Sequence, residues 1–337
     1  MTARHLGIAS VCVTAMFAPS TRATGGQAVN QAEARRWYKG NTHTHTLNSD
    51  GDSAPDDVVR WYREHGYQFV VLTDHEFITP VDGLNATFGA AEKFLVIPGQ
   101  EVTGNFQGKP VHVNGLNLKR VVTPVKGTSV LDVLQRDVDG VRDAGAVPQI
   151  NHPNFGWGLT TDDISRVERA RLIEIWNGHP FVNNLGGGGS PSAEEMWDAA
   201  LTAGRVLYGI ADDDSHYFKR IGDPAAPTPG HGWVVVRTAR LEAGAIVDAL
   251  DRGEFYASTG VELTDYQVTE KHISLTIRAT GQSRYRVAFI GAGGRVLAET
   301  FENPAIYVFR GDERYVRARV LESNGAMAWT QPVFPAR

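Results

Sequence analysis

The sequence is almost free of cysteine. Cys12 is the only one among 337 residues, so no disulfide can form within the chain and no cluster of thiolate ligands is available. Cys12 also lies in a segment that we expect to be removed from the mature protein. Any metal site must therefore be built from nitrogen and oxygen ligands.

The chain also lacks a strong excess of charge. Lys and Arg total 33 and Asp and Glu total 38, which gives a formal net charge of -5, and no basic stripe is present. This balance gives no electrostatic reason to expect nucleic acid as a partner. The apolar run 6–18 is too short to cross a bilayer, so we expect no membrane span.

The N-terminus has the order of a secretory signal. Arg4 precedes the apolar run, and the small-residue site Thr21-Arg22-Ala23 follows it. We expect a signal peptide over 1–23, a small and polar linker over 24–36, and a periplasmic or secreted protein. The alternative is a hydrophobic N-terminus of a cytosolic protein.

From Trp37 onward, short apolar runs alternate with helical patterns, which predicts a parallel α/β barrel or a doubly wound sheet over 37–262. The runs are 68–72, 94–98, 111–116, 147–150, 172–176, 206–210 and 233–236. Helices are expected over 55–65 with Ser53 as N-cap, over 129–144, after a capping box at Ser192 and Glu195, and over 240–252.

After Val261 the pattern changes to short alternating strands separated by turn-like breaks, such as Ser323-Asn324-Gly325. Strands are expected over 273–278, 285–290, 295–299, 305–309 and 315–321. The pattern predicts a small antiparallel β-sandwich over 263–337.

Side chains that bind metals recur in clusters, most of them just after an apolar run. Because parallel strands present their carboxyl ends at one edge, we expect these clusters to meet in one cleft. His43 and His45, at i and i+2, would share one face of a strand. Taken alone, His43 and His45 could lie in a polar network, Asp50 would be a turn residue, and His112 and His152 would be hydrogen-bonded core residues. Asp74-His75 is a stronger signal, because a buried strand that ends in two ionisable groups needs a reason to carry them. Their joint occurrence favours a multinuclear metal site formed by His43, His45, Asp50, His75, Glu101, His112, His152, Asp214 and His216.

The order and spacing of these motifs resemble the PHP (polymerase and histidinol phosphatase) metallohydrolases. The motifs are His-x-His at 43–45, Ser-Asp-Gly at 49–51, Leu-Thr-Asp-His at 72–75, Gly-x-Glu at 99–101, His-x-Asn at 112–114, Asn-His-Pro at 151–153 and Asp-x-His at 214–216. The segments 99–103, 174–178 and 328–332 resemble the CehA/McbA branch, which includes a carbaryl hydrolase.

The resemblance implies a distorted barrel of seven parallel strands, in agreement with the seven apolar runs. It also implies two or three divalent ions of zinc, manganese or iron. One ion would be held by His43, His45, Glu101 and Asp214, with Glu101 bridging to a second ion on His112 and His152. A third would take Asp50, His75 and His216. The triplet Asp212-Asp213-Asp214 leaves the register of the aspartate ligand open.

Four further residues are candidates for substrate contact. His179 follows the run 172–176 and is placed to assist the leaving group, or else lies on a surface loop. Lys219 and Arg220 follow His216 and would suit an anionic substrate, although such pairs are usually solvated. Asn177 is a further candidate for substrate binding.

These expectations combine into a hydrolase of a small molecule. A metal-bridging hydroxide would attack the substrate, with Glu101 as bridging catalytic residue and His179 as proton donor. A phosphate ester is the favoured substrate, and a carbamate, amide or carboxylic ester is the alternative. A non-catalytic exported binding module and a nuclease are the remaining hypotheses. The sequence leaves the metal and the oligomeric state open.

Overall fold

The computed structural model describes residues 1–2, 34–89 and 93–335. The chain divides into two units, Met1–Glu33 and Ala34–Arg337. The predicted signal peptide and most of the predicted linker lie outside the described residues.

A thirteen-stranded sheet organises the unit, in the order β13-β12-β15-β16-β9-β8-β1-β2-β3-β4-β5-β6-β7. Each of the seven predicted apolar runs contributes to a strand, and the segment beginning near Trp37 adds another. The eight strands before residue 240 are β1 (Arg36–Asn41), β2 (Phe69–Leu72), β3 (Leu95–Phe106), β4 (Lys109–Leu116), β5 (Val147–Ile150), β6 (Leu172–Asn177), β7 (Tyr208–Asp212) and β8 (Trp233–Thr238).

The prediction that all seven apolar runs form parallel strands is wrong for two of them, the runs that form β4 and β8. β4 is antiparallel to both β3 and β5, and β8 is antiparallel to β1. β4 is antiparallel to β3 because the connection between them is very short. Gln107 and Gly108 form a two-residue turn with φ of 51° and 84°, and such a tight turn joins only antiparallel strands. The other six strands, β1, β2, β3, β5, β6 and β7, share one direction.

The two ends of this set of strands meet. A single parallel bridge joins Thr44, just after β1, to Ser215, just after β7. The main-chain N–H of His45 also donates to the oxygen of Ser215 at 2.9 Å. Residues that follow β1 and β7 are therefore neighbours, although about 170 positions separate them in the sequence.

Helices return the chain between strands, as the pattern predicted. They are α1 (Pro55–Glu64), α2 (Asp82–Phe88), α3 (Val130–Asp143), α4 (Thr161–Arg166), α5 (Ala193–Thr202) and α6 (Ala243–Asp251). The capping box of Ser192 and Glu195 is present at α5. Ser53 is not the N-cap of α1: that position is Ala54, and the Ser53 hydroxyl donates to Asp52 instead.

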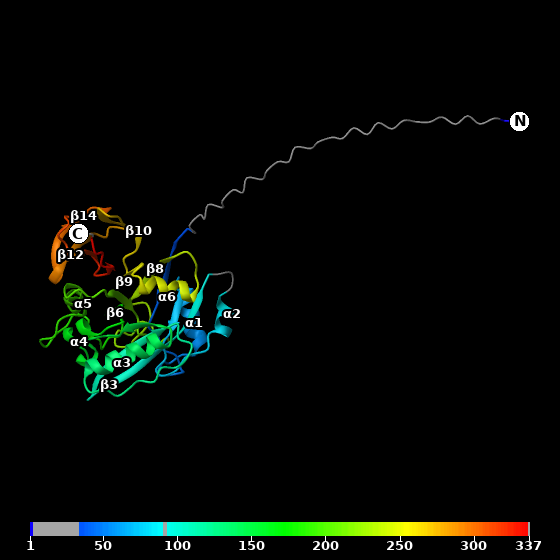
Figure 1. Cartoon of the computed structure of the whole chain (residues 1–337), viewed down its shortest axis with the longest axis horizontal. Helices are drawn as coiled ribbons and strands as arrows, with labels where there is room; N and C mark the ends of the chain where they lie inside the picture. The colour runs from blue at the N-terminus through cyan, green and yellow to red at the C-terminus, as the bar shows by residue number, and fades with distance from the viewer. Residues whose placement is uncertain (3–33, 90–92, 336–337) are drawn as a thin grey trace. The chain divides into compact units, whose positions relative to one another are not determined.

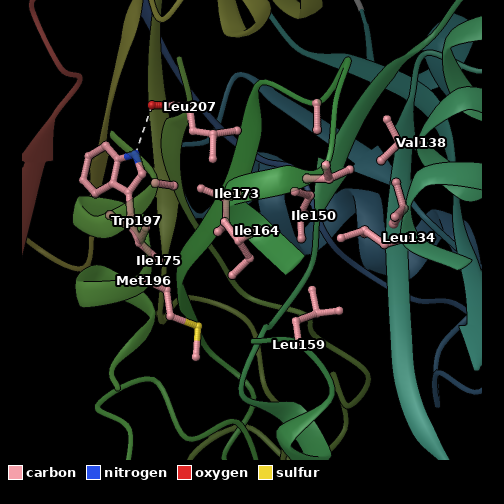
Figure 2. Packing of buried hydrophobic residues seen from close by; sticks show 14 of the residues in the cluster. Leu134, Val138, Ile150, Leu159, Ile164, Ile173, Ile175, Met196, Trp197 and Leu207 are labelled. Atoms are coloured by element: carbon pink, nitrogen blue, oxygen red, sulfur yellow. Dashed lines mark hydrogen bonds between the residues drawn. The ribbon is translucent and has the colours of Figure 1, made fainter. Parts of the chain in front are cut away.

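The largest core cluster packs helices α3, α4 and α5 against the strands (Figure 2). Leu134 and Val138 of α3 approach Ile150, while Met196 and Trp197 of α5 lie beside Ile175. The Trp197 indole N–H donates to the Leu207 oxygen at 3.0 Å, which satisfies the one polar atom of this buried ring. This packing holds the strands from which the site is built.

The C-terminal segment forms antiparallel strands around a core of its own. They are β9 (Phe255–Ser258), β10 (Leu263–Val268), β11 (His272–Ile277), β12 (Tyr285–Gly291), β13 (Arg295–Thr300), β14 (Ala305–Val308), β15 (Arg317–Glu322) and β16 (Met327–Thr330). Buried side chains of the sheet β10-β11-β14 pack in one hydrophobic cluster with buried side chains of β12 and β15. β10, β12 and β14 lie together at one end of the unit (Figure 1).

β16 pairs with β9, so the C-terminal strands continue the sheet of the rest of the unit. The predicted domain boundary between residues 262 and 263 stays a prediction, and so does the β-sandwich architecture of the C-terminal segment. None of the helices in the described ranges is long and apolar enough to cross a membrane.

Candidate metal centre

The structure brings all nine predicted ligands together at one edge of the sheet. They lie in three groups whose nitrogen and oxygen atoms are within 4.8 Å of one another. Most of them follow strand ends, with His43 and His45 after β1 and His152 after β5. Glu101 and His112 are exceptions to the predicted placement, because both lie inside the long strands β3 and β4 of the hairpin.

The first group contains His43, His45, Glu101 and Asp214, all buried. The His43 Nε2 atom lies 3.2 Å from both Glu101 Oε2 and Asp214 Oδ1. The His45 Nε2 atom lies 3.3 Å from the same two oxygens. Two imidazoles and two carboxylates therefore converge on one small volume.

Glu101 joins this group to a second one. Its Oε2 atom faces His43 and His45, while its Oε1 atom lies 3.0 Å from His112 Nδ1 and 3.1 Å from His152 Nε2. The Asn151 amide donates to the same Oε1 atom at 2.9 Å, which fixes the carboxylate plane. One carboxylate thus presents a separate oxygen to each of two imidazole groups.

Asp50 is the centre of the third group. Its oxygens lie 3.4 Å from His216 Nε2, 3.5 Å from His45 Nδ1 and 3.6 Å from His75 Nε2. His45 therefore faces the first group with Nε2 and Asp50 with Nδ1. The turn that carries Asp50 contributes to the cluster, as the joint occurrence of the motifs predicted, although Asp50 taken alone would be a turn residue.

The residues fit divalent metal ions. The donor set is imidazole nitrogen and carboxylate oxygen, the combination that zinc, manganese and iron accept. The His45 Nε2 atom is buried and makes no hydrogen bond with the described residues, even though two carboxylate oxygens lie close by. A cation among these atoms would supply the partner that this nitrogen lacks.

The pKa values follow from the crowding of unlike charges. Burial lowers the pKa of His43, but the charges of Asp214, Glu101 and Glu174 outweigh it and raise the pKa well above its ordinary value. Burial raises the pKa of Glu101, but His43 and His112 outweigh it and hold the pKa well below its usual range. Both carboxylates of the first group are therefore ionised and ready to bind cations.

Beneath the first group lies a buried layer that the sequence did not assign. Glu174 Oε1 is 2.7 Å from His43 Nδ1, and Glu174 Oε2 accepts from the His152 main-chain N–H at 2.6 Å. Gln149 donates to Glu174 and, at 2.8 Å, to Asp212. Glu174 interrupts the apolar run 172–176 of β6 with a charge, and this unusual placement was the available signal.

The three consecutive aspartates have three different environments. Asp214 is the member that faces the histidines. Asp213 accepts from the main-chain N–H groups of His231 and Gly232, and Asp212 lies beside Glu174. Asp214 has φ of 47°, a left-handed conformation that turns its side chain toward the cluster at a local energetic cost. Asp214 is therefore the aspartate that faces both His43 and His45, whereas Asp212 lies within 4.8 Å of His43 and Glu174.

A cavity of about 380 Å³ opens over the cluster. His179 lines it, together with the aromatic residues Phe155, Phe181 and Tyr217 and a single cation, Arg220. The His179 Nδ1 atom accepts from the Phe181 main-chain N–H at 3.2 Å, so its proton resides on Nε2. Burial lowers the pKa of His179 to about 4, which leaves the ring neutral near neutral pH.

Two of the predicted substrate contacts lie elsewhere. The Lys219 ammonium donates to the main-chain oxygen of Asp52 at 2.6 Å, and Lys219 does not line the cavity. Asn177 does not line this cavity but a neighbouring cleft, and its amide donates to the carboxylates of Glu174 and Asp214, which orients them. Arg220 does line the cavity, where its guanidinium pairs with Asp223 at 2.5 Å.

Comparisons with known proteins agree with the fold. No family model matches the chain. A 5'-3' exoribonuclease of Haemophilus influenzae is 28% identical over 183 residues, which are 50% of this chain and 65% of that protein, so the match covers less than two thirds of the relative.

Solved structures give a likeness over more of the chain. A two-domain protein of Bacteroides vulgatus, described as containing a predicted PHP-like metal-dependent phosphoesterase, superposes with a TM-score of 0.52 and 15% identity over 92% of this chain and 100% of the other. An amidohydrolase of Chromobacterium violaceum superposes with a TM-score of 0.37 and 17% identity over 53% of this chain and 88% of the other. A TM-score this low does not show a shared fold. The first likeness shows that this chain shares its fold with that two-domain protein, and it does not reach the CehA/McbA branch.

Proposed function

We propose that this chain is a divalent-metal-dependent hydrolase of small phosphate esters. The observation that carries the proposal is the position of Glu101, whose two oxygens face two separate sets of imidazoles. This is the arrangement that a bridging carboxylate between adjacent cations requires. The completeness of the nine-residue cluster supports two or three ions, of zinc, manganese or iron.

Bound divalent ions would lower the pKa of a coordinated water and stabilise charge on the substrate oxygen. The chain supplies the rest. Glu174 and Asn151 fix the orientation of His43 and Glu101. Neutral His179, with its proton on Nε2, is placed beside the cluster to donate a hydrogen bond to the leaving oxygen. The aromatic residues around it exclude water from one side of the cavity.

A phosphoester is favoured over a carbamate for two reasons. Among the residues that the structure describes, Arg220 is the only Lys or Arg that lines the cavity, and a guanidinium suits phosphate geometry. The matched relative is an exoribonuclease, an enzyme that cleaves phosphodiester bonds. The alternative of the CehA/McbA type, a carbamate, amide or carboxylic ester, is supported by the motif resemblance and by the aromatic wall. We further propose that the protein is exported and acts on a small-molecule partner.

The test is hydrolysis by the purified protein after chelation and reloading with manganese or zinc. The substrates are p-nitrophenyl phosphate, bis-p-nitrophenyl phosphate, 1-naphthyl methylcarbamate and a short RNA. We expect phosphate release that disappears with chelator and returns with metal. Turnover of only the carbamate would overturn the phosphoester assignment, and efficient digestion of RNA would favour the nuclease that the charge balance disfavours.

The ligand variant His43→Ala separates catalysis from mere binding. We expect it to lose hydrolysis and to bind less metal, with His65→Ala, an exposed histidine of α1's C-terminus, as the matched control. Retention of full activity by His43→Ala would instead support the non-catalytic binding module.

A further inference from the structure

A second cleft lies next to the cavity of the metal centre. It has a volume of about 510 Å³, and His179 lines both spaces. One wall comes from the end of β6 and the loop after it, including Trp176 and Gly178. The opposite wall comes from the β15–β16 turn of the C-terminal strands, with Asn324, Gly325 and Ala326. A molecule whose reacting group lies over the cluster would extend past His179 into this cleft.

Both walls are held in place by hydrogen bonds. Asn184 and Asn177 exchange two bonds, Asn177 N–H to Asn184 at 2.9 Å and the Asn184 amide to the Asn177 oxygen at 2.8 Å. On the other side, the Thr259 N–H donates to the Met327 oxygen at 2.9 Å, and the Met327 N–H donates back to the Thr259 hydroxyl at 2.9 Å. The turn is therefore fixed to the end of β9, and the cleft is preformed.

The chemistry of the walls indicates what they would bind. Within the described part of the chain, no Lys or Arg lines the cleft, so a second phosphate would find no Lys or Arg side chain there. The lining instead offers amide, hydroxyl and imidazole groups from residues such as Asn324, Thr259 and His231, with the Trp176 indole as an apolar face. Polar groups beside one aromatic face suit a neutral, hydroxylated ring.

The geometry points to a leaving-group subsite for the sugar part of a sugar phosphate monoester, shared between the β6 loop and the β15–β16 turn. This inference rests on the proposed phosphoesterase function. Hydrolysis breaks the P–O bond to the sugar, water supplies the new oxygen on phosphorus, and the sugar leaves as the free alcohol. The C-terminal strands would thus contribute to specificity.

The experiment compares glucose 1-phosphate with acetyl phosphate, whose leaving group is too short to reach the turn. We expect Asn324→Trp, which fills the cleft from an exposed turn, to lower kcat/KM for glucose 1-phosphate about tenfold more than for acetyl phosphate. His231→Leu, which changes another residue that lines the cleft, should also lower kcat/KM more for glucose 1-phosphate than for acetyl phosphate. Gln282→Trp is the matched control, because it adds the same side chain to a turn outside the cleft.

Binding of methyl glucoside, followed by saturation-transfer NMR, separates this subsite from the proposed function. We expect wild type and Gln282→Trp to bind it at about millimolar concentration and Asn324→Trp to lose binding. Binding with this pattern but without hydrolysis of any phosphate ester would support the subsite and overturn the proposed function. Two results together would overturn the subsite alone. The ratio of kcat/KM for glucose 1-phosphate to kcat/KM for acetyl phosphate would be equal in Asn324→Trp and Gln282→Trp, and the wild type would not bind methyl glucoside.

Discussion

At the scale of single residues, function depends on which atoms a side chain faces more than on its type. Asp212, Asp213 and Asp214 are identical and adjacent, yet only Asp214 approaches the first group of histidines closely. The left-handed φ at Asp214 separates its direction from that of its neighbours. Glu174 shows the same principle, because its buried carboxylate acts on the cluster through His43.

Glu174→Gln tests that positioning role. The carboxylate holds the proton of His43 on Nδ1 and leaves Nε2 facing Glu101 and Asp214. We expect metal affinity and kcat/KM to fall about 10- to 100-fold, as for other carboxylates behind a metal-binding histidine. Metal titration and steady-state kinetics measure this. The exposed Glu242→Gln is the control, and unchanged metal affinity in Glu174→Gln would rule the role out.

Asp137 predicts a pH dependence of stability. Burial in α3 raises the pKa of Asp137 to about 7, and the charge of Glu76 adds to the rise. The folded state therefore binds this proton more tightly than the unfolded state, so stability falls as pH rises from about 4 to about 7.

We expect Asp137→Asn to remove this loss. The variant should match wild type near about pH 4 and exceed its free energy of unfolding by roughly 2–4 kcal/mol near about pH 8. Urea unfolding at both pH values measures the difference. A variant that is equally or less stable at the higher pH would contradict the expected ionisation.

At the scale of elements, local signals decided where helices begin, and turns decided strand direction. The capping boxes at Thr160 and Ser192 each satisfy main-chain donors at the start of a helix. The two-residue turn at Gln107 and Gly108 reverses β4, and that reversal brings His112 opposite Thr103 on β3, close to Glu101. A hairpin therefore supplies part of the candidate metal centre.

Ser192→Ala tests the cap of α5. The Ser192 hydroxyl accepts from the Glu195 N–H at 3.1 Å, and its loss leaves that donor to water. We expect a destabilisation of about 1 kcal/mol with little change in hydrolysis. Thermal and urea unfolding check this, with Ser283→Ala in a turn between strands as the control. A loss equal to that of the control would show that the cap contributes nothing.

At the scale of the whole unit, the C-terminal strands and the strands of the metal centre share one sheet and one set of buried ion pairs. Arg317 of β15 is fully buried and contacts Asp198 of α5 at 2.6 Å and Glu194 at 2.8 Å. These contacts, with the pairing of β16 and β9, predict that both regions unfold together.

Arg317→Ala should therefore destabilise the unit as a whole. It leaves Asp198 buried without its partner, and we expect a loss of about 3–5 kcal/mol in one cooperative transition. Arg319→Ala, whose pair with Glu194 is partly exposed, should cost no more than about 1 kcal/mol. Two separate transitions, by circular dichroism and tryptophan fluorescence, would contradict the shared unit.

The sequence by itself determined the features that depend on near neighbours. Apolar runs became strands, the capping box at Ser192 became a helix start, and the His, Asp and Glu motifs identified the residues that meet in the cluster. These signals act over a few residues, so they can be read along the chain.

Only the tertiary structure decided how distant segments face one another. The direction of β4, the pairing of β16 with β9, the role of Glu174 behind His43 and the position of Lys219 at Asp52 all depend on contacts across long separations. Such contacts depend on how the strands and helices pack together, because packing determines which side chains lie close enough to interact. The motifs identified the residues of the cluster, and the fold determined which side chains support them.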